Sequence, residues 1–124
     1  MSSAVPEYLA LLHSPEKGDR CRAAEKLGAM GPVGIEAVRS LLADPNWLLR
    51  YRAAEIIGFT ADPIGIPLLT QLLFDEKDHV RYMAVKSLGL CGTRALEPII
   101  TPMQKDENPF VRRITAGVLS GWKL

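Results

Sequence analysis

Apolar residues recur along this chain at steps of three and four residues. In residues 35–42 and 64–73, isoleucine, valine and leucine are separated at this spacing by polar or small residues. The segments 8–12 and 95–103 have the same pattern. A three- and four-residue spacing places apolar side chains on one face of a helix, whereas a strand would alternate every second residue. The pattern therefore predicts amphipathic helices rather than strands.

A second kind of segment occurs four times and makes the chain repetitive. It contains an arginine, then small residues and, in three of the four copies, a glycine at its last position, as in residues 49–58 and 80–89. The arginines are Arg20, Arg50, Arg81 and Arg112, which lie 30, 31 and 31 residues apart. Six positions before them stand Ser14, Asp44, Asp75 and Asp106. A period of this length is typical of stacked helical repeats.

Turn-forming residues separate the two segments of each repeat. Ser14-Pro15, Asp44-Pro45 and Asn108-Pro109 supply capping oxygens and prolines suited to a first helical turn. Gly31 and Gly92 follow the arginine-bearing segments, where a glycine can end a helix. We therefore expect an all-α fold, a right-handed α-solenoid of four helical hairpins with eight helices. It forms a single domain over residues 1–124, with repeats at about 4–31, 32–61, 62–92 and 93–122.

Composition and charge narrow the environment and the partners. The chain is 48% hydrophobic and 23% charged, as in ordinary folded proteins, and its net charge of +1 gives no general attraction to nucleic acid. Residues 1–7 lack the basic start and apolar run of a secretory signal, and no apolar stretch reaches the roughly 18 residues of a membrane span. The two cysteines form no disulfide framework. These features predict a reduced cytoplasmic protein without membrane contact.

The repeat motif resembles that of a known family. The pattern Asp-x5-Arg-x-x-Ala-Ala-x-x-x-Gly, followed by Ala-Leu-Glu-Pro-Ile-Ile, is similar to the short HEAT repeats of the phycobilisome-lyase-like class. The match is best at residues 44–58 and 75–98 and extends from about 4 to 122. The resemblance implies that the repeated aspartates and arginines form a polar ladder between stacked hairpins, where a planar guanidinium suits a carboxylate. It also implies that the arginine-bearing helices line a concave face.

The positions expected on that concave face form the candidate binding site. They carry Arg22, Trp47, Tyr51, Arg52, Glu55, His79, Tyr82, Met83, Lys86, Phe110 and Arg113. Tyrosine, tryptophan, phenylalanine, methionine and arginine are enriched at protein interfaces, whereas a solvated helical face favours glutamate, lysine and glutamine. We therefore expect a protein partner here. The alternative is that some of the large apolar residues on this face fill the core. For Phe59 and Leu90, which lie near helix ends, the sequence leaves both a core and a surface placement open.

The sequence shows no recognisable catalytic motif. His13 and His79 are the two histidines, and neither is followed by the glutamate of the His-Glu pairs by which metal-dependent HEAT hydroxylases bind iron. Gly-rich phosphate loops and nucleophile motifs are missing. Cys21, beside two arginines on the concave face, is a weak candidate for a reactive thiol, while Cys91 suits the core. The sequence thus predicts a scaffold or adaptor that is not an enzyme, with no catalytic residue, metal or cofactor.

Two other functions fit the same face less well. Relatives in the class include bilin lyases, so an aromatic groove with arginines could hold a tetrapyrrole, as in a lyase or a chromophore-handling subunit. Nucleic acid is an unlikely partner, because Glu25, Glu55 and Asp78 on the face balance most of its arginines and lysines.

Overall fold

The structure, a computed structural model, describes residues 4–122 and consists of helices joined by short turns. Eight α-helices and four 3-10 helices occur within these residues, and the same residues contain no strand. The α-helices are α1 (Val5–Leu11), α2 (Lys17–Gly28), α3 (Pro32–Val38), α4 (Trp47–Thr60), α5 (Ile66–Leu72), α6 (Asp78–Cys91), α7 (Glu97–Ile100) and α8 (Pro109–Trp122). The 3-10 helices are η1 (Arg39–Ala43), η2 (Pro63–Gly65), η3 (Arg94–Leu96) and η4 (Thr101–Lys105).

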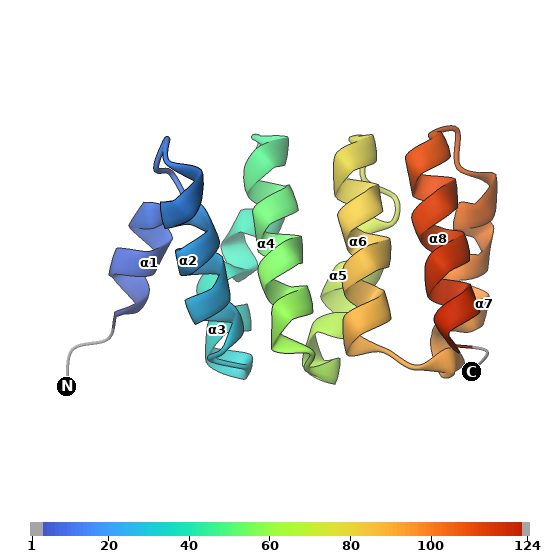
Figure 1. Ribbon diagram of the computed structural model, residues 1–124, viewed down its shortest axis with the longest axis horizontal. Coiled ribbons are helices and arrows are strands. Elements are labelled where there is room, and N and C mark those ends of the chain that lie inside the picture. Colours follow the sequence, from blue (N-terminus) through green and yellow to red (C-terminus); the bar gives the residue numbers. More distant parts are fainter. Residues whose placement is uncertain (1–3, 123–124) are drawn as a thin grey trace.

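The helices form four antiparallel hairpins that stack in one direction. In Figure 1 the helices α2, α4, α6 and α8 stand side by side in a row, with α3, α5 and α7 behind them. The most extensive helix contacts join α4 to α6, α6 to α8 and α2 to α4, so each hairpin packs on the next. The predicted α-solenoid of four helical hairpins is therefore confirmed.

Some first helices of the hairpins are broken rather than continuous. The predicted helix at 35–42 becomes 3-10 after Val38, and the segment at 95–103 is divided among η3, α7 and η4. In the fourth hairpin, Pro102 has no N–H to donate to a preceding carbonyl, so the α-helical hydrogen-bond pattern ends just before it.

Small residues allow the arginine-bearing helices to approach closely. Ala53, Ala54 and Ala84 are fully buried between neighbouring helices. A Cβ atom added at Gly28 would lie 2.5 Å from the Cβ of Phe59, and one added at Gly58 would overlap the Ser87 side chain. The alanine and glycine positions of the repeat motif are therefore explained by packing.

The repeated arginines form the expected polar ladder at two of the boundaries between hairpins. The Nε of Arg50 donates to Asp75 at 2.9 Å, and its Nη1 donates to the carbonyl of Asp44 at 2.7 Å. Arg81 repeats this with Asp106 at 3.0 Å and the carbonyl of Asp75 at 2.8 Å. Both arginines are buried, and the hydrogen bond to the aspartate raises the pKa of each guanidinium, so both stay charged.

The two outer arginines make only the local half of this arrangement. Arg20 donates to the carbonyl of Ser14 at 2.8 Å and Arg112 to that of Asp106 at 2.6 Å. Among the described residues, neither contacts a carboxylate of a neighbouring hairpin. The ladder thus has two complete rungs, at the second and third hairpin boundaries.

Candidate functional site

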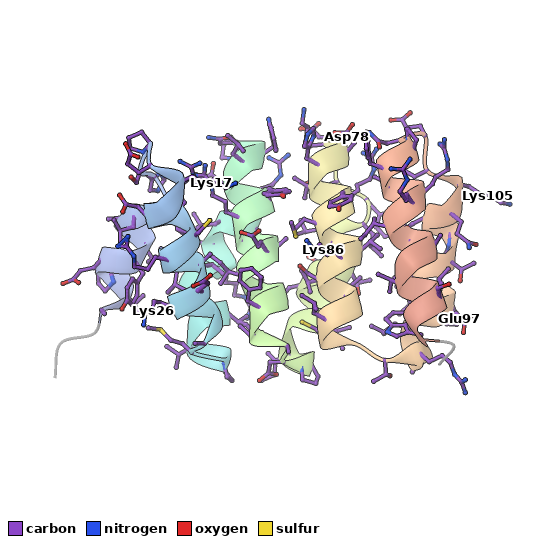
Figure 2. All side chains as sticks on the ribbon, in the orientation of Figure 1. Lys17, Lys26, Asp78, Lys86, Glu97 and Lys105 are labelled. Atoms are coloured by element: carbon purple, nitrogen blue, oxygen red, sulfur yellow. The ribbon has the colours of Figure 1, made fainter. Side chains whose placement is uncertain are left out.

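The row of α2, α4, α6 and α8 presents one continuous face, which we call the second-helix face. Figure 2 shows Asp78 at the N-terminal end of α6 and Lys86 midway along that helix. The N-terminal ends of α4 and α6 bring together the rings that the sequence singled out, and two clefts are open between the helices.

A cluster of rings lies at the start of α4 and α6. Trp47 is the first residue of α4, which begins there because the Asn46 side chain accepts a hydrogen bond from the N–H of Leu48 at 3.0 Å. The indole lies 4.8 Å from the His79 ring, centre to centre, and 6.3 Å from the Tyr51 ring in an edge-to-face arrangement. The Nζ of Lys77 lies 4.6 Å above the indole as a cation–π contact.

Beside this cluster is a cleft of about 210 Å³ between α4, α6 and α8. We call it the aromatic cleft; its walls are Tyr51, Asp78, His79, Tyr82, Asn108 and Phe110. The Phe110 ring is 62% exposed, and the guanidinium of Arg113 lies 5.6 Å from its centre. Aromatic side chains with a few fixed polar groups at the edge form a surface suited to an apolar anchor from a ligand.

Asp78 fixes the polar edge of the aromatic cleft. Its carboxylate accepts the backbone N–H of His79 at 2.8 Å, contacts the His79 Nδ1 at 2.8 Å, and accepts the amide of Asn108 at 2.6 Å. The hydrogen bond with the His79 ring is the main cause that lowers the pKa of Asp78. Asp78 therefore remains ionised at neutral pH and orients both neighbours.

A second cleft, of about 380 Å³, opens between α2 and α4. We call it the basic cleft; it is lined by Leu12, Lys17, Arg20, Cys21, Ala24, Leu48, Tyr51, Arg52 and Glu55. Tyr51 belongs to both clefts and stands between them. Burial raises the pKa of Glu55, an effect that Lys86 and Arg52 oppose.

The structure distributes the residues of the candidate site over these two clefts and their edges. Tyr51, His79, Tyr82 and Phe110 line the aromatic cleft, and Arg52 and Glu55 line the basic cleft. Trp47 packs on His79, and the guanidinium of Arg113 lies over one face of the Phe110 ring. Arg22 and Lys86 are exposed, and Arg22 pairs with Asp19 on its own helix at 3.4 Å.

The expectation that Met83 points to the concave surface is wrong. Met83 is 3% exposed and belongs to the hydrophobic core. It lies three residues after Val80 and four before Ser87, both of them buried, so it shares their face of α6. By contrast, Phe59 and Leu90 are 47% and 52% exposed, so neither is a core residue.

Sequence reasoning did not include several residues that shape the clefts. Asn108 was identified only as a cap, and Lys17, Arg20 and Lys77 were not assigned to the site. The repeat period carried a signal for Asn108. It lies one period of 31 residues after Lys77, the residue before Asp78, so stacking of the two hairpins brings it near Asp78.

A family model for HEAT repeats matches residues 5–81, more than half of the chain. The chain belongs to the HEAT-repeat family. The resemblance to HEAT repeats seen in the sequence is thereby confirmed. No curated protein sequence matches this HEAT-repeat chain.

Solved structures share the fold of this HEAT-repeat protein. Human deoxyhypusine hydroxylase in complex with glycerol superposes with a TM-score of 0.76 and 24% identity, over 96% of this chain and 43% of that chain. The complex of CpcE and CpcF of phycocyanin lyase from a Nostoc species gives 0.69 and 22%, over 96% and 52%. An engineered protein gives 0.65 and 18%, over 96% and 62%. The HEAT-repeat chain spans less than two-thirds of each.

The expectation that the chain is not an enzyme is wrong. Deoxyhypusine hydroxylase and phycocyanin lyase are enzymes, and their structures have this fold. A solenoid positions side chains from separate repeats on one face, so reacting groups need not form a local sequence motif, and the fold is compatible with catalysis.

Residues 4–122 contain no group of three or more histidine, cysteine, aspartate or glutamate side chains arranged to hold a metal ion. No helix within them combines the length and the apolar character required to cross a membrane.

Proposed function

We propose that this HEAT-repeat protein acts as a scaffold or adaptor that binds a partner protein through the second-helix face, with the aromatic cleft at the centre of the contact. The observation that carries the proposal is the meeting of Tyr51, Tyr82 and Phe110 around an open cleft at one end of α4, α6 and α8. Phe110 is 62% exposed and stands beside Tyr51 and Tyr82, and a group of exposed rings, unlike a single exposed ring, is typical of a binding site.

The size and charge of the aromatic cleft favour a protein side chain as its occupant. Its volume of about 210 Å³ lies below the roughly 300–1,000 Å³ of pockets that enclose small molecules and cofactors. Such a cleft accepts an apolar side chain better than a tetrapyrrole. Asp78 in its wall and Arg113 at its edge carry opposite charges, which does not suit a phosphate backbone.

The polar edge supports a specific contact. Asp78 and Asn108 are held in place by their mutual hydrogen bond, so they offer fixed acceptors and donors around the apolar floor. A pre-ordered edge loses little side-chain entropy when the partner binds. The proposal concerns binding, and a bound partner can equally be a substrate.

The test is an affinity purification from the source organism with quantitative mass spectrometry, using three versions of the protein. Tyr82→Ala combined with Phe110→Ala removes two walls of the aromatic cleft. Phe74→Ala is the matched control, because Phe74 is 83% exposed and lies outside both clefts. Proteins bound through the cleft are lost from the double variant and retained by the control.

The partner found in this way is then titrated against the purified proteins by calorimetry. A loss of about 2 kcal/mol or more in the double variant, with the control unchanged, is the expected result for an anchor of this kind. If all three versions retain the same proteins with the same affinity, the aromatic cleft is not the binding site.

A further inference from the structure

The basic cleft has an unusual charge balance for a gap between packed helices. Lys17, Arg20 and Arg52 line it, while Glu55 is the one carboxylate in its walls. The cations come from two helices, α2 and α4, so the cleft and not a single helix brings them together. Leu12 and Leu48 add apolar wall to the same space.

Arg20 lacks the carboxylate that the two inner arginines of the ladder possess. Arg50 and Arg81 each bind an aspartate of the following hairpin, at 2.9 Å and 3.0 Å. The corresponding residue for Arg20 is Asp44, whose carboxylate accepts the backbone N–H of Asn46 at 2.8 Å and forms no hydrogen bond or ion pair with Arg20. Within residues 4–122, Arg20 therefore donates only to a carbonyl, that of Ser14.

Asp19, which precedes Arg20 on α2, does not form an ion pair with Arg20. Asp19 accepts the hydroxyl of Ser14 at 2.9 Å and pairs with Arg22 at 3.4 Å. Neither Asp19 nor Arg22 lines the basic cleft.

Arg52, on the opposite wall of the basic cleft, also has no carboxylate partner. Its Nη1 donates to the carbonyl of Leu12 at the end of α1, and it forms no ion pair with the described carboxylates. Partial burial and the positive charge of Arg20 both lower the pKa of Arg52. Glu55 in the same wall partly opposes this effect, but neither guanidinium forms an ion pair with it. Three cations thus line this space with one carboxylate, an arrangement that a bound anion would stabilise.

We propose that the basic cleft is an oxyanion site, in which Lys17, Arg20 and Arg52 hold a carboxylate or phosphate group. Guanidinium groups bind both kinds of oxyanion through paired N–H donors, and a lysine ammonium adds a mobile charge. The apolar walls exclude part of the water and so strengthen these contacts. The site is distinct from the aromatic cleft and extends beyond the proposed function, since its ligand is defined by charge.

The cleft contains its own chemical reporter. Cys21 lines it and is exposed, whereas Cys91 is buried and burial raises the pKa of its thiol. Only the thiolate attacks a disulfide reagent, so in the folded protein Cys21 reacts and Cys91 does not. The neutral reagent 4,4′-dithiodipyridine forms a mixed disulfide with the Cys21 sulfur and releases one thiopyridone, which is followed by absorbance.

The experiment measures the rate of this reaction with inorganic phosphate or glutarate at constant ionic strength, adjusted with chloride. An anion in the cleft covers Cys21, so at about twice its dissociation constant the rate falls about threefold, because only a third of the molecules remain empty. Protection by phosphate identifies a phosphate site, and protection by glutarate identifies a carboxylate site.

Three variants assign the effect to the cleft. Arg20→Met and Lys17→Gln are expected to abolish the protection. Lys17 makes no hydrogen bond or ion pair with the described residues, so Lys17→Gln leaves the fold unchanged, as circular dichroism will verify. Arg22→Met is the matched control, because Arg22 is next to Cys21 in the sequence but outside the cleft, and it retains the protection.

The proposal is overturned if neither anion slows the reaction, or if the slowing persists in both Arg20→Met and Lys17→Gln. Its outcome is independent of the partner-binding proposal, because Tyr82→Ala changes the aromatic cleft alone and leaves the anion effect intact.

Discussion

The amide of Asn108 donates a hydrogen bond of 2.6 Å to the carboxylate of Asp78, across the boundary between the third and fourth hairpins. The same Asn108 side chain accepts the N–H of Phe110 at 2.7 Å and so caps α8. One residue therefore starts a helix, joins it to its neighbour and forms an edge of the aromatic cleft.

Replacing Asn108 with alanine should destabilise the protein by about 1–3 kcal/mol. The variant loses a helix cap, which contributes about 1 kcal/mol, and a hydrogen bond to a charged group. Asn108→Ser is the matched control, since its hydroxyl keeps a capping oxygen but does not reproduce the amide contact with Asp78. Urea unfolding should place the serine variant between the wild type and the alanine variant. Equal stability of all three would show that neither contact contributes.

The lowered pKa of Asp78 gives this contact a defined pH dependence. Because the pKa is lower in the folded protein than in the unfolded chain, Asp78 stabilises the fold above its unfolded pKa, about 3.9. That contribution is lost as the pH falls through the folded value. Asp78→Asn should thus reduce the loss of stability below about pH 4, measured by urea unfolding from pH 7 to pH 2. A curve that parallels the wild type throughout would contradict the assignment.

Removing Arg50 should be far more damaging than removing Arg112. Arg50→Ala leaves the Asp75 carboxylate, with 10% exposed side chain, without its partner, a change that costs about 3–5 kcal/mol. Arg112 is exposed and bonds only to a carbonyl, so Arg112→Ala should cost within about 1 kcal/mol. Thermal and urea unfolding of both variants will compare them. Similar losses in the two would mean that the aspartate contact adds little.

Met83 and Lys86 lie three residues apart on α6, but replacing them with alanine should change the stability of the fold by very different amounts. Met83→Ala removes a buried core side chain and should cost about 2–5 kcal/mol. Lys86→Ala changes an exposed position and should stay within about 0.5 kcal/mol. Both free energies of unfolding are measured with urea. A Met83→Ala variant as stable as the wild type would contradict the assignment of Met83 to the core.

The repeat spacing was sufficient to predict the hairpins, and the resemblance to HEAT repeats implied the ladder. The interval of 31 residues from Arg50 to Arg81, and the aspartates six positions before each arginine, follow directly from the stacking of equal units. Contacts such as Arg50 with Asp75 recur because each unit repeats the same local geometry.

The departures from regularity follow only in part from the spacing. Arg20 and Asp44 are 24 residues apart, one fewer than the 25 residues between the partners of each complete rung, and their side chains bond elsewhere. Met83 and Arg52 occupy corresponding places in their repeats, but an apolar side chain can enter the gap between hairpins where a guanidinium must find an acceptor. The clefts depend on these packing differences.

Tyr51 is a wall of both the aromatic cleft and the basic cleft. A movement of its ring that widens one cleft would take space from the other, so the partner and the anion that we propose would share this side chain as a common boundary. If binding of one changes the affinity for the other, the effect would be equal in both directions, because such coupling is reciprocal.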